Sequence, residues 1–128
     1  MINTSQRDRL LWIDGTAGTF VGITTLLLLN WLYPLYQLPR NIVLIITAAN
    51  LVYGGYALFV ASRKKRPIEL VVALAAANLA WMFVCIGFLV FYGKQASIFG
   101  LMHIAGEGAF VTMLAVLEWR WRYDLQTS

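Results

Sequence analysis

Two ionisable residues one helical turn apart, His103 and Glu107, are the strongest candidates for chemistry in this chain. Both lie in the apolar segment 97–119, and residues at i and i+4 share one face of a helix. An ionisable side chain at bilayer depth costs roughly 3 kcal/mol on insertion scales, so it usually faces a partner, a cavity or a proton path. We therefore expect His103 and Glu107 to line an interior site as a hydrogen-bonded or ionic pair.

Two asparagines are predicted to lie at a depth similar to that of Glu107. The pattern Ala-Ala-Asn-Leu-x-aromatic occurs twice and places Tyr53 after Asn50 and Trp81 after Asn78. Buried side-chain amides need hydrogen-bond partners in a membrane. In one interpretation the two asparagines bind each other or a neighbouring backbone carbonyl. In the other they join Glu107 in one polar layer that receives a ligand, with Tyr53 and Trp81 as aromatic walls suited to a cation.

A second acidic group, Asp14, Glu69 and Glu118, lies toward the side on which the termini are expected. Glu118 follows Glu107 by eleven residues, which is about three turns, so these two carboxylates share a helix face. We expect Glu69 and Glu118 to form ion pairs at the membrane interface. Glu118 and Asp14 are also candidates for a proton path that starts at Glu107.

Composition assigns the chain to membrane proteins. It has 128 residues, 60% hydrophobic and 12% charged, whereas soluble domains carry about 25% charged residues. The single cysteine, Cys85, excludes an intrachain disulfide and a multi-cysteine metal site. No motif of a standard hydrolase, redox or nucleotide-binding protein is present. We expect no metal, no cofactor and no nucleic-acid partner, with membrane lipids as the surroundings.

Four apolar segments are long enough for transmembrane helices, which need about 20 residues. They span about 10–33, 41–62, 68–92 and 97–119, and Pro34 and Pro39 are expected to end the first. Connections this short force neighbouring helices to be antiparallel. The prediction is an all-α, up-down-up-down bundle of four transmembrane helices, forming a single domain over residues 1–128.

The basic residues predict the orientation of this bundle. Eight of them fall on the side of the termini and of the loop between the second and third segments, and two fall on the other side. Because basic residues collect in cytoplasmic loops, both termini are predicted to be cytoplasmic, in a multi-pass protein of the bacterial inner membrane. The eight are Arg7, Arg9, Arg63, Lys64, Lys65, Arg66, Arg120 and Arg122, and the two are Arg40 and Lys94.

Small residues indicate where helices approach closely. Gly18 and Gly22 form a GxxxG pair in the first segment, and such pairs let membrane helices pack with their backbones near each other. Two uses stay open, packing within the chain and the interface of a parallel homodimer.

The chain resembles small bacterial four-helix integral membrane proteins without assigned function. The resemblance extends over nearly the whole chain and rests on Asp14-Gly15, Leu38-Pro39, the two Ala-Asn-Leu-x-aromatic segments, Gly100 through Glu107, and Glu118. It implies a four-helix fold and no particular activity.

A local segment, His103 to Val111, is similar to the His-x-x-x-Glu-Gly-x-Phe-Val segment of emopamil-binding, sterol-isomerase-like proteins of the EXPERA group. In that family the histidine and the glutamate lie in a membrane cavity that binds sterols or cationic amphiphiles and takes part in proton transfer. The similarity covers nine residues, and this chain is shorter than those enzymes. It implies an amphiphile-binding cavity at His103 and Glu107.

Small multidrug-resistance transporters also combine four short helices with a buried glutamate. Their carboxylate lies in the first helix, and their dual-topology members lack a strong charge bias. The bias of eight basic residues to two in this chain predicts parallel subunits in any dimer.

Three functions remain open at this point. The first is the binding or transport of a small lipophilic or cationic molecule, in a pocket of His103, Glu107, Asn50, Asn78, Trp81 and Tyr53 that is coupled to protons. The second is a structural or accessory subunit in which these residues fix helix register. The third is a membrane enzyme in which His103 and Glu107 perform acid–base chemistry.

Overall fold

The computed structural model describes residues 4–125, with side chains from Asp8 onward, so that the side chain of Arg7 lies outside the described part. Within this range the chain is helical and contains no strand. The helices are α1 (Thr4–Leu27), α2 (Leu29–Tyr36), α3 (Arg40–Ser62), α4 (Ile68–Tyr92), α5 (Ile98–Arg120) and α6 (Arg122–Leu125). Helices α1, α3, α4 and α5 are long and apolar enough to cross a membrane. The predicted all-α protein with four long apolar helices is confirmed.

The first apolar segment differs from the prediction. Helix α1 ends at Leu27, the chain bends at Leu28, and α2 continues through Pro34 to Tyr36. The expectation that Pro34 ends the helix was wrong, because the proline ring fixes φ near the helical value and disturbs mainly the turn that precedes it. The helix ends instead at Gln37, in a left-handed conformation with φ of 54°.

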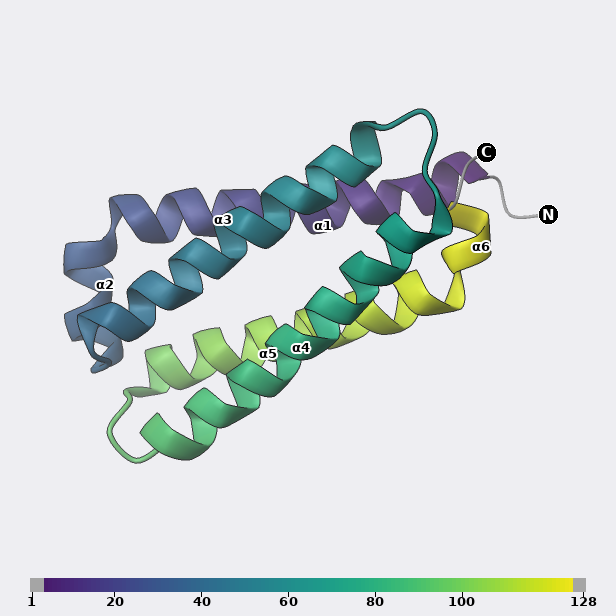
Figure 1. Cartoon of the computed structure of the whole chain (residues 1–128). Helices are drawn as coiled ribbons and strands as arrows, with labels where there is room; N and C mark the ends of the chain where they lie inside the picture. Colours follow the sequence, from purple (N-terminus) through teal and green to yellow (C-terminus); the bar gives the residue numbers. More distant parts are fainter. Residues whose placement is uncertain (1–3, 126–128) are drawn as a thin grey trace.

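The four long helices form two pairs (Figure 1). Helix α1 packs chiefly on α3, and α4 packs chiefly on α5, while contacts between the pairs are fewer. Successive long helices alternate in direction, so that the first helix begins beside α6 at one end of the molecule (Figure 1). We call this the α6 end and the opposite one the α2 end.

Glycines permit the close contact of α1 with α3. A Cβ atom built on Gly18 would lie 3.0 Å from the Cα atom of Gly54, and one on Gly22 would lie 2.7 Å from the Leu51 side chain. Side chains at these positions would force the helices apart. The GxxxG pair of Gly18 and Gly22 is thus used within the chain.

Apolar side chains fill two regions between the helices. The first lies toward the α6 end and includes Leu11, Val60, Leu74, Leu114 and Leu125. The second lies toward the α2 end and includes Leu29, Ile42, Ile46, Trp81 and Ile104. The polar side chains described below lie between or beside these two regions.

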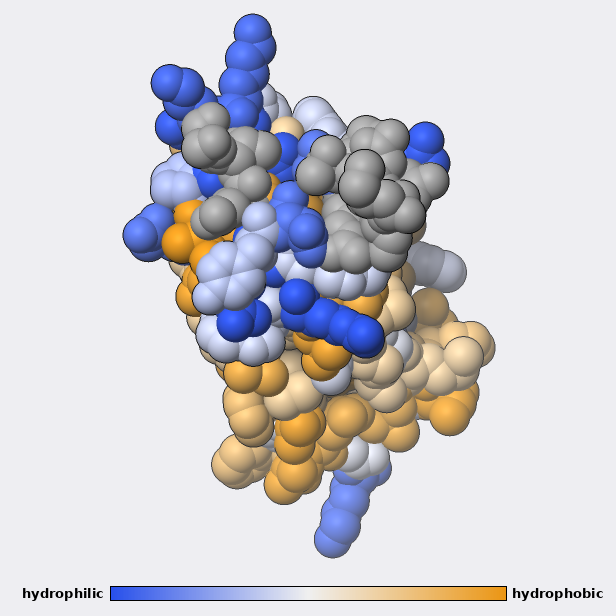
Figure 2. Space-filling model, turned by 90° about the vertical axis from the view of Figure 1, so that its right-hand side faces the viewer, coloured by the Kyte–Doolittle hydropathy of each residue, from blue (hydrophilic) through white to orange (hydrophobic). Residues whose placement is uncertain are grey.

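Hydrophilic residues gather at the α6 end of the molecule, and hydrophobic residues dominate the flank next to it (Figure 2). Many large apolar side chains are exposed on the outer faces of the helices, among them Phe20, Val90 and Phe91. Exposed apolar surface of this extent is typical of a protein that contacts lipid.

The start of α5 is attached to the end of α2. The Ser97 backbone N–H donates to the Tyr36 carbonyl at 2.8 Å, and the Ser97 hydroxyl donates to the Leu35 carbonyl at 2.7 Å. A Cβ atom on Gly100 would lie 2.8 Å from the Tyr36 carbonyl oxygen, so glycine is needed for this approach. The contact places the Tyr36 ring beside the first turns of α5.

Candidate functional site

The Glu107 carboxylate is held by donors from two other helices. Asn50 of α3 donates from Nδ2 to Glu107 Oε1 at 2.5 Å, and Trp81 of α4 donates from Nε1 to Glu107 Oε2 at 2.8 Å. The second proton of the Asn50 amide goes to the Ile46 carbonyl of its own helix at 2.9 Å. Only 9% of the Glu107 side chain is exposed. Each carboxylate oxygen therefore has an N–H donor from another helix.

His103 lies on the α2 side of Glu107, as their i,i+4 spacing predicts. Its Nε2 atom is 3.8 Å from Glu107 Oε1, which is too long for a hydrogen bond. This nitrogen has no hydrogen-bond partner among the residues that the structure describes. Its Nδ1 atom lies 3.0 Å from the Tyr36 hydroxyl. Burial raises the pKa of the Tyr36 phenol, and the Glu107 carboxylate raises it further. The phenol thus keeps its proton, and a row of polar groups runs from Tyr36 through His103 to Glu107.

Asn78 occupies a different place from the one predicted. It donates from Nδ2 both to Asp14 Oδ2, at 3.0 Å, and to Glu118 Oε1, at 2.7 Å. The hypothesis of one polar layer of Asn50, Asn78 and Glu107 was wrong. The two asparagines do not bind each other, but the expected bond to a neighbouring backbone carbonyl is confirmed for Asn50, which donates to Ile46. The two amides lie at different depths, because Asn78 bonds Glu118, about three turns along α5 from the Glu107 that Asn50 bonds.

Glu118 also departs from its predicted role as a partner in an interface ion pair. Its side chain is fully buried, it accepts from Asn78, and its Oε2 atom has no hydrogen-bond partner within residues 4–125. Asp14 is 5% exposed and meets Glu118 at the same amide nitrogen. The carboxylates of Asp14 and Glu118 are thus brought together, and no hydrogen bond of the described residues links them to Glu107.

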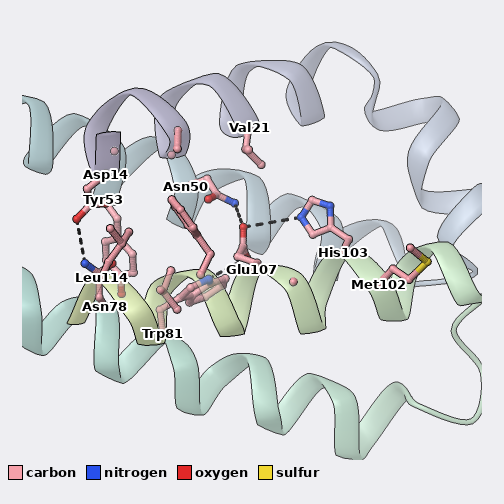
Figure 3. A pocket seen from close by; sticks show the side chains of 16 residues that line it. Asp14, Val21, Asn50, Tyr53, Asn78, Trp81, Met102, His103, Glu107 and Leu114 are labelled. Atoms are coloured by element: carbon pink, nitrogen blue, oxygen red, sulfur yellow. Dashed lines mark hydrogen bonds and ion pairs between the residues drawn. The ribbon is translucent and has the colours of Figure 1, made fainter. Parts of the chain in front are cut away.

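One cavity of about 450 Å³ lies between the helix pairs and contacts both groups of polar residues (Figure 3). In the close-up, Asp14 and Asn78 lie toward one end of it, Asn50, Trp81 and Glu107 lie in the middle, and His103 lies toward the other end. All six predicted ligand-binding residues line it, and Asp14 lines it as well. The lining consists of Asp14, Ala17, Gly18, Val21, Asn50, Tyr53, Gly54, Asn78, Trp81, Met102, His103, Gly106, Glu107, Phe110, Val111 and Leu114.

Aromatic rings form much of the wall next to Glu107. The Tyr53 and Trp81 rings meet edge to face with centroids 6.0 Å apart, and Phe88 meets Trp81 in the same way at 6.1 Å. Trp81 was predicted only as an aromatic wall. Its indole N–H in addition donates a hydrogen bond to the Glu107 carboxylate.

Three contributors to the site were missed in the sequence. Tyr36 lies 67 residues before its partner His103, and no local pattern connects the two positions. Met102 and Gly106 line the cavity from α5, at positions one residue before each member of the His103–Glu107 pair. For these two, a helical wheel drawn around the pair would have provided the signal, since residues adjacent to a face border it.

No protein family, no curated protein and no solved structure matches this chain.

Proposed function

We propose that this protein is a multi-pass membrane protein that binds a small lipophilic cation in the cavity beside Glu107. In the proposed orientation the chain is an up-down-up-down bundle in the bacterial inner membrane, and both termini are cytoplasmic. The hydrophilic α6 end and the bias of eight basic residues to two support this orientation.

The observation that supports the proposal is a buried carboxylate in the wall of an apolar cavity, where the basic side chain recorded beside it is that of His103, 3.8 Å away. The residues that line the cavity within 4–125 include Glu107 and Asp14 but no lysine and no arginine. Concave, mostly apolar cavities with a few convergent polar groups are typical ligand sites. A cation placed there gains the attraction of the carboxylate and of the faces of aromatic rings such as Tyr53 and Phe110.

The ligand is proposed to reach the cavity sideways, between α1 and α5. These two helices make few contacts with each other, and both contribute to the lining. On α5, Met102 and Gly106 line the cavity and are exposed. A lipophilic cation dissolved in the bilayer would pass this gap without crossing the layer of charged residues at the α6 end.

The test is calorimetric titration of tetraphenylphosphonium into the purified protein in lipid nanodiscs. Saturable binding by the natural chain is expected to weaken at least about tenfold in Glu107→Gln, because the substitution removes the charge and keeps the size. Glu69→Gln is the matched control, since Glu69 is exposed at the start of α4 and lies outside the cavity. Equal affinity in the natural chain and in Glu107→Gln would refute the proposal.

A second pair of variants tests sideways access. A Cβ atom on Gly106 would meet no heavy atom within 4 Å, so Gly106→Phe starts from an open position and places a ring at the cavity. Gly55→Phe is equally open at its Cβ and lies outside the cavity, which makes it the control. We expect slower and weaker binding in Gly106→Phe only. Identical binding rates in both variants would exclude access between α1 and α5.

A structural or accessory role is the second candidate, and one observation favours it. Both Glu107 oxygens already have donors within the chain, so the residue can fix the register of α3, α4 and α5 without any ligand. In that case Glu107→Gln would lower stability and the natural chain would show no saturable binding. The predicted parallel homodimer stays a prediction, and the Gly18–Gly22 pair does not supply its interface.

A further inference from the structure

Asp14 and Glu118 form a second candidate site, at the end of the cavity nearest α6. Their oxygens Oδ2 and Oε1 accept from one nitrogen, Asn78 Nδ2, at 3.0 and 2.7 Å. Because both oxygens accept from the same nitrogen, the two carboxylates lie close together. All three side chains are at least 95% buried, with exposures of 5% for Asp14, 1% for Asn78 and 0% for Glu118.

The side chain that donates to both acids is uncharged. Helix α4 contributes the neutral Asn78, and the neighbouring core residues of α1, α3, α4 and α5 are apolar, namely Leu11, Ala57, Leu74 and Leu114. The ionisable groups nearest along α1 are Asp8 and Arg9, and Asp8 pairs with Arg66 at 3.2 Å. On the other side, Glu107 and His103 belong to the separate group in the middle of the cavity.

The carboxylate oxygens of this pair outnumber the hydrogen-bond donors recorded for them. The Asn78 amide supplies two protons for four carboxylate oxygens, and Glu118 Oε2 is completely buried with no partner in the described part of the chain. Two like charges this close in a medium of low dielectric constant repel strongly, so one carboxylate of such a pair keeps a proton. A proton on this pair makes one carboxylate neutral, so that fewer buried oxygens need a donor.

We propose that Asp14 and Glu118 together bind one exchangeable proton, and that a cation in the cavity expels it. The coupling part of this proposal rests on the proposed function. Asp14 lines the cavity that Glu107 also lines, whereas Glu118 is not among the residues that line it. The positive charge of a bound cation attracts both carboxylates in their ionised forms, and the O–H bond of the pair breaks as its proton leaves for the water at the α6 end.

The experiment has two measurements on the whole protein in lipid nanodiscs. Infrared difference spectroscopy during a pH titration follows the carbonyl stretch of a protonated carboxylic acid. We expect such a band in the natural chain and in Glu69→Gln, and its loss in Asp14→Asn and in Glu118→Gln. Titration with tetraphenylphosphonium in weakly buffered solution with an indicator dye counts released protons. Release should approach one proton per bound cation, and Glu118→Gln should bind within about threefold of the natural affinity but release none.

The two proposals fail in different ways. If the natural chain binds the cation and releases no proton, the coupling is refuted and the binding proposal stands. If it does not bind the cation, the proposed function fails, and the infrared band still decides whether Asp14 and Glu118 hold a proton. A spectrum without a band that responds to Asp14→Asn and Glu118→Gln would overturn the proton site itself.

Discussion

The two carboxylate groups of this protein differ in how many N–H donors each acid receives. Glu107 has two donors from two helices, one for each oxygen. Asp14 and Glu118 share the single amide of Asn78. Because carboxylates in an apolar interior need hydrogen-bond donors, both oxygens of Glu107 are supplied, whereas those of Asp14 and Glu118 are not all supplied. Burial does not distinguish the two carboxylate groups, since the side chains of Asp14, Glu107 and Glu118 are all largely enclosed.

The largest effect should come from separating the helices that carry the two groups. A Cβ atom on Gly54 would collide with the Thr19 backbone nitrogen and lie 2.7 Å from Thr19 Oγ1, whereas one on its neighbour Gly55 would meet nothing within 4 Å. Gly54→Leu should destabilise the fold by about 3 kcal/mol, because α1 must move off α3. Unfolding in mixed micelles with increasing dodecyl sulfate measures this. Equal stability of Gly54→Leu and Gly55→Leu would contradict the packing described here.

The next effect concerns the two asparagines. Asn78→Leu should cost about 3 kcal/mol, because it removes the hydrogen-bond donor of two buried carboxylates at once. Asn50→Leu should cost about 1 kcal/mol, because Trp81 still donates to Glu107. The same unfolding measurement compares the two variants. Similar losses of stability would mean that the two carboxylate groups do not differ as their donors indicate.

Replacing Glu107 or Glu118 by glutamine tests the difference between the two carboxylate groups. In Glu107→Gln the new amide places an N–H group against the donor of Asn50 or of Trp81, so a loss of about 1 to 2 kcal/mol is expected. Glu118→Gln imitates an acid that already holds its proton and should change stability by no more than about 0.5 kcal/mol. A larger loss of stability in Glu118→Gln than in Glu107→Gln would contradict the proposal that Asp14 and Glu118 together bind a proton.

The smallest effect is expected at Tyr36. Tyr36→Phe removes the hydroxyl next to His103 Nδ1 and should cost about 0.5 kcal/mol. The chain has one histidine, so the ¹⁵N resonances of its ring report the tautomer directly. These resonances should shift in Tyr36→Phe and stay unchanged in Tyr56→Phe, whose hydroxyl donates to the Leu70 carbonyl far from the histidine. Unchanged ring resonances in Tyr36→Phe would exclude the contact.

The sequence predicted the helices better than their contacts. Three apolar segments were placed to within one residue, since charged or proline-containing loops flank them. The bend at Leu28 had no such marker, because no glycine or proline occurs there. Residues that share one helix face were also foreseen, as for His103 and Glu107. Partners on different helices were not, because residue spacing within one helix leaves open how far neighbouring helices are shifted along each other and rotated about their own axes.

Helix α4 links the two carboxylate groups mechanically. Asn78 and Trp81 lie one turn apart on it, and the first holds Asp14 and Glu118 while the second holds Glu107. A movement of α4 along its axis relative to α1 and α5 would therefore strain the hydrogen bonds of both carboxylate groups together. The donors Asn78 and Trp81 thus couple the position of α4 to both carboxylate groups.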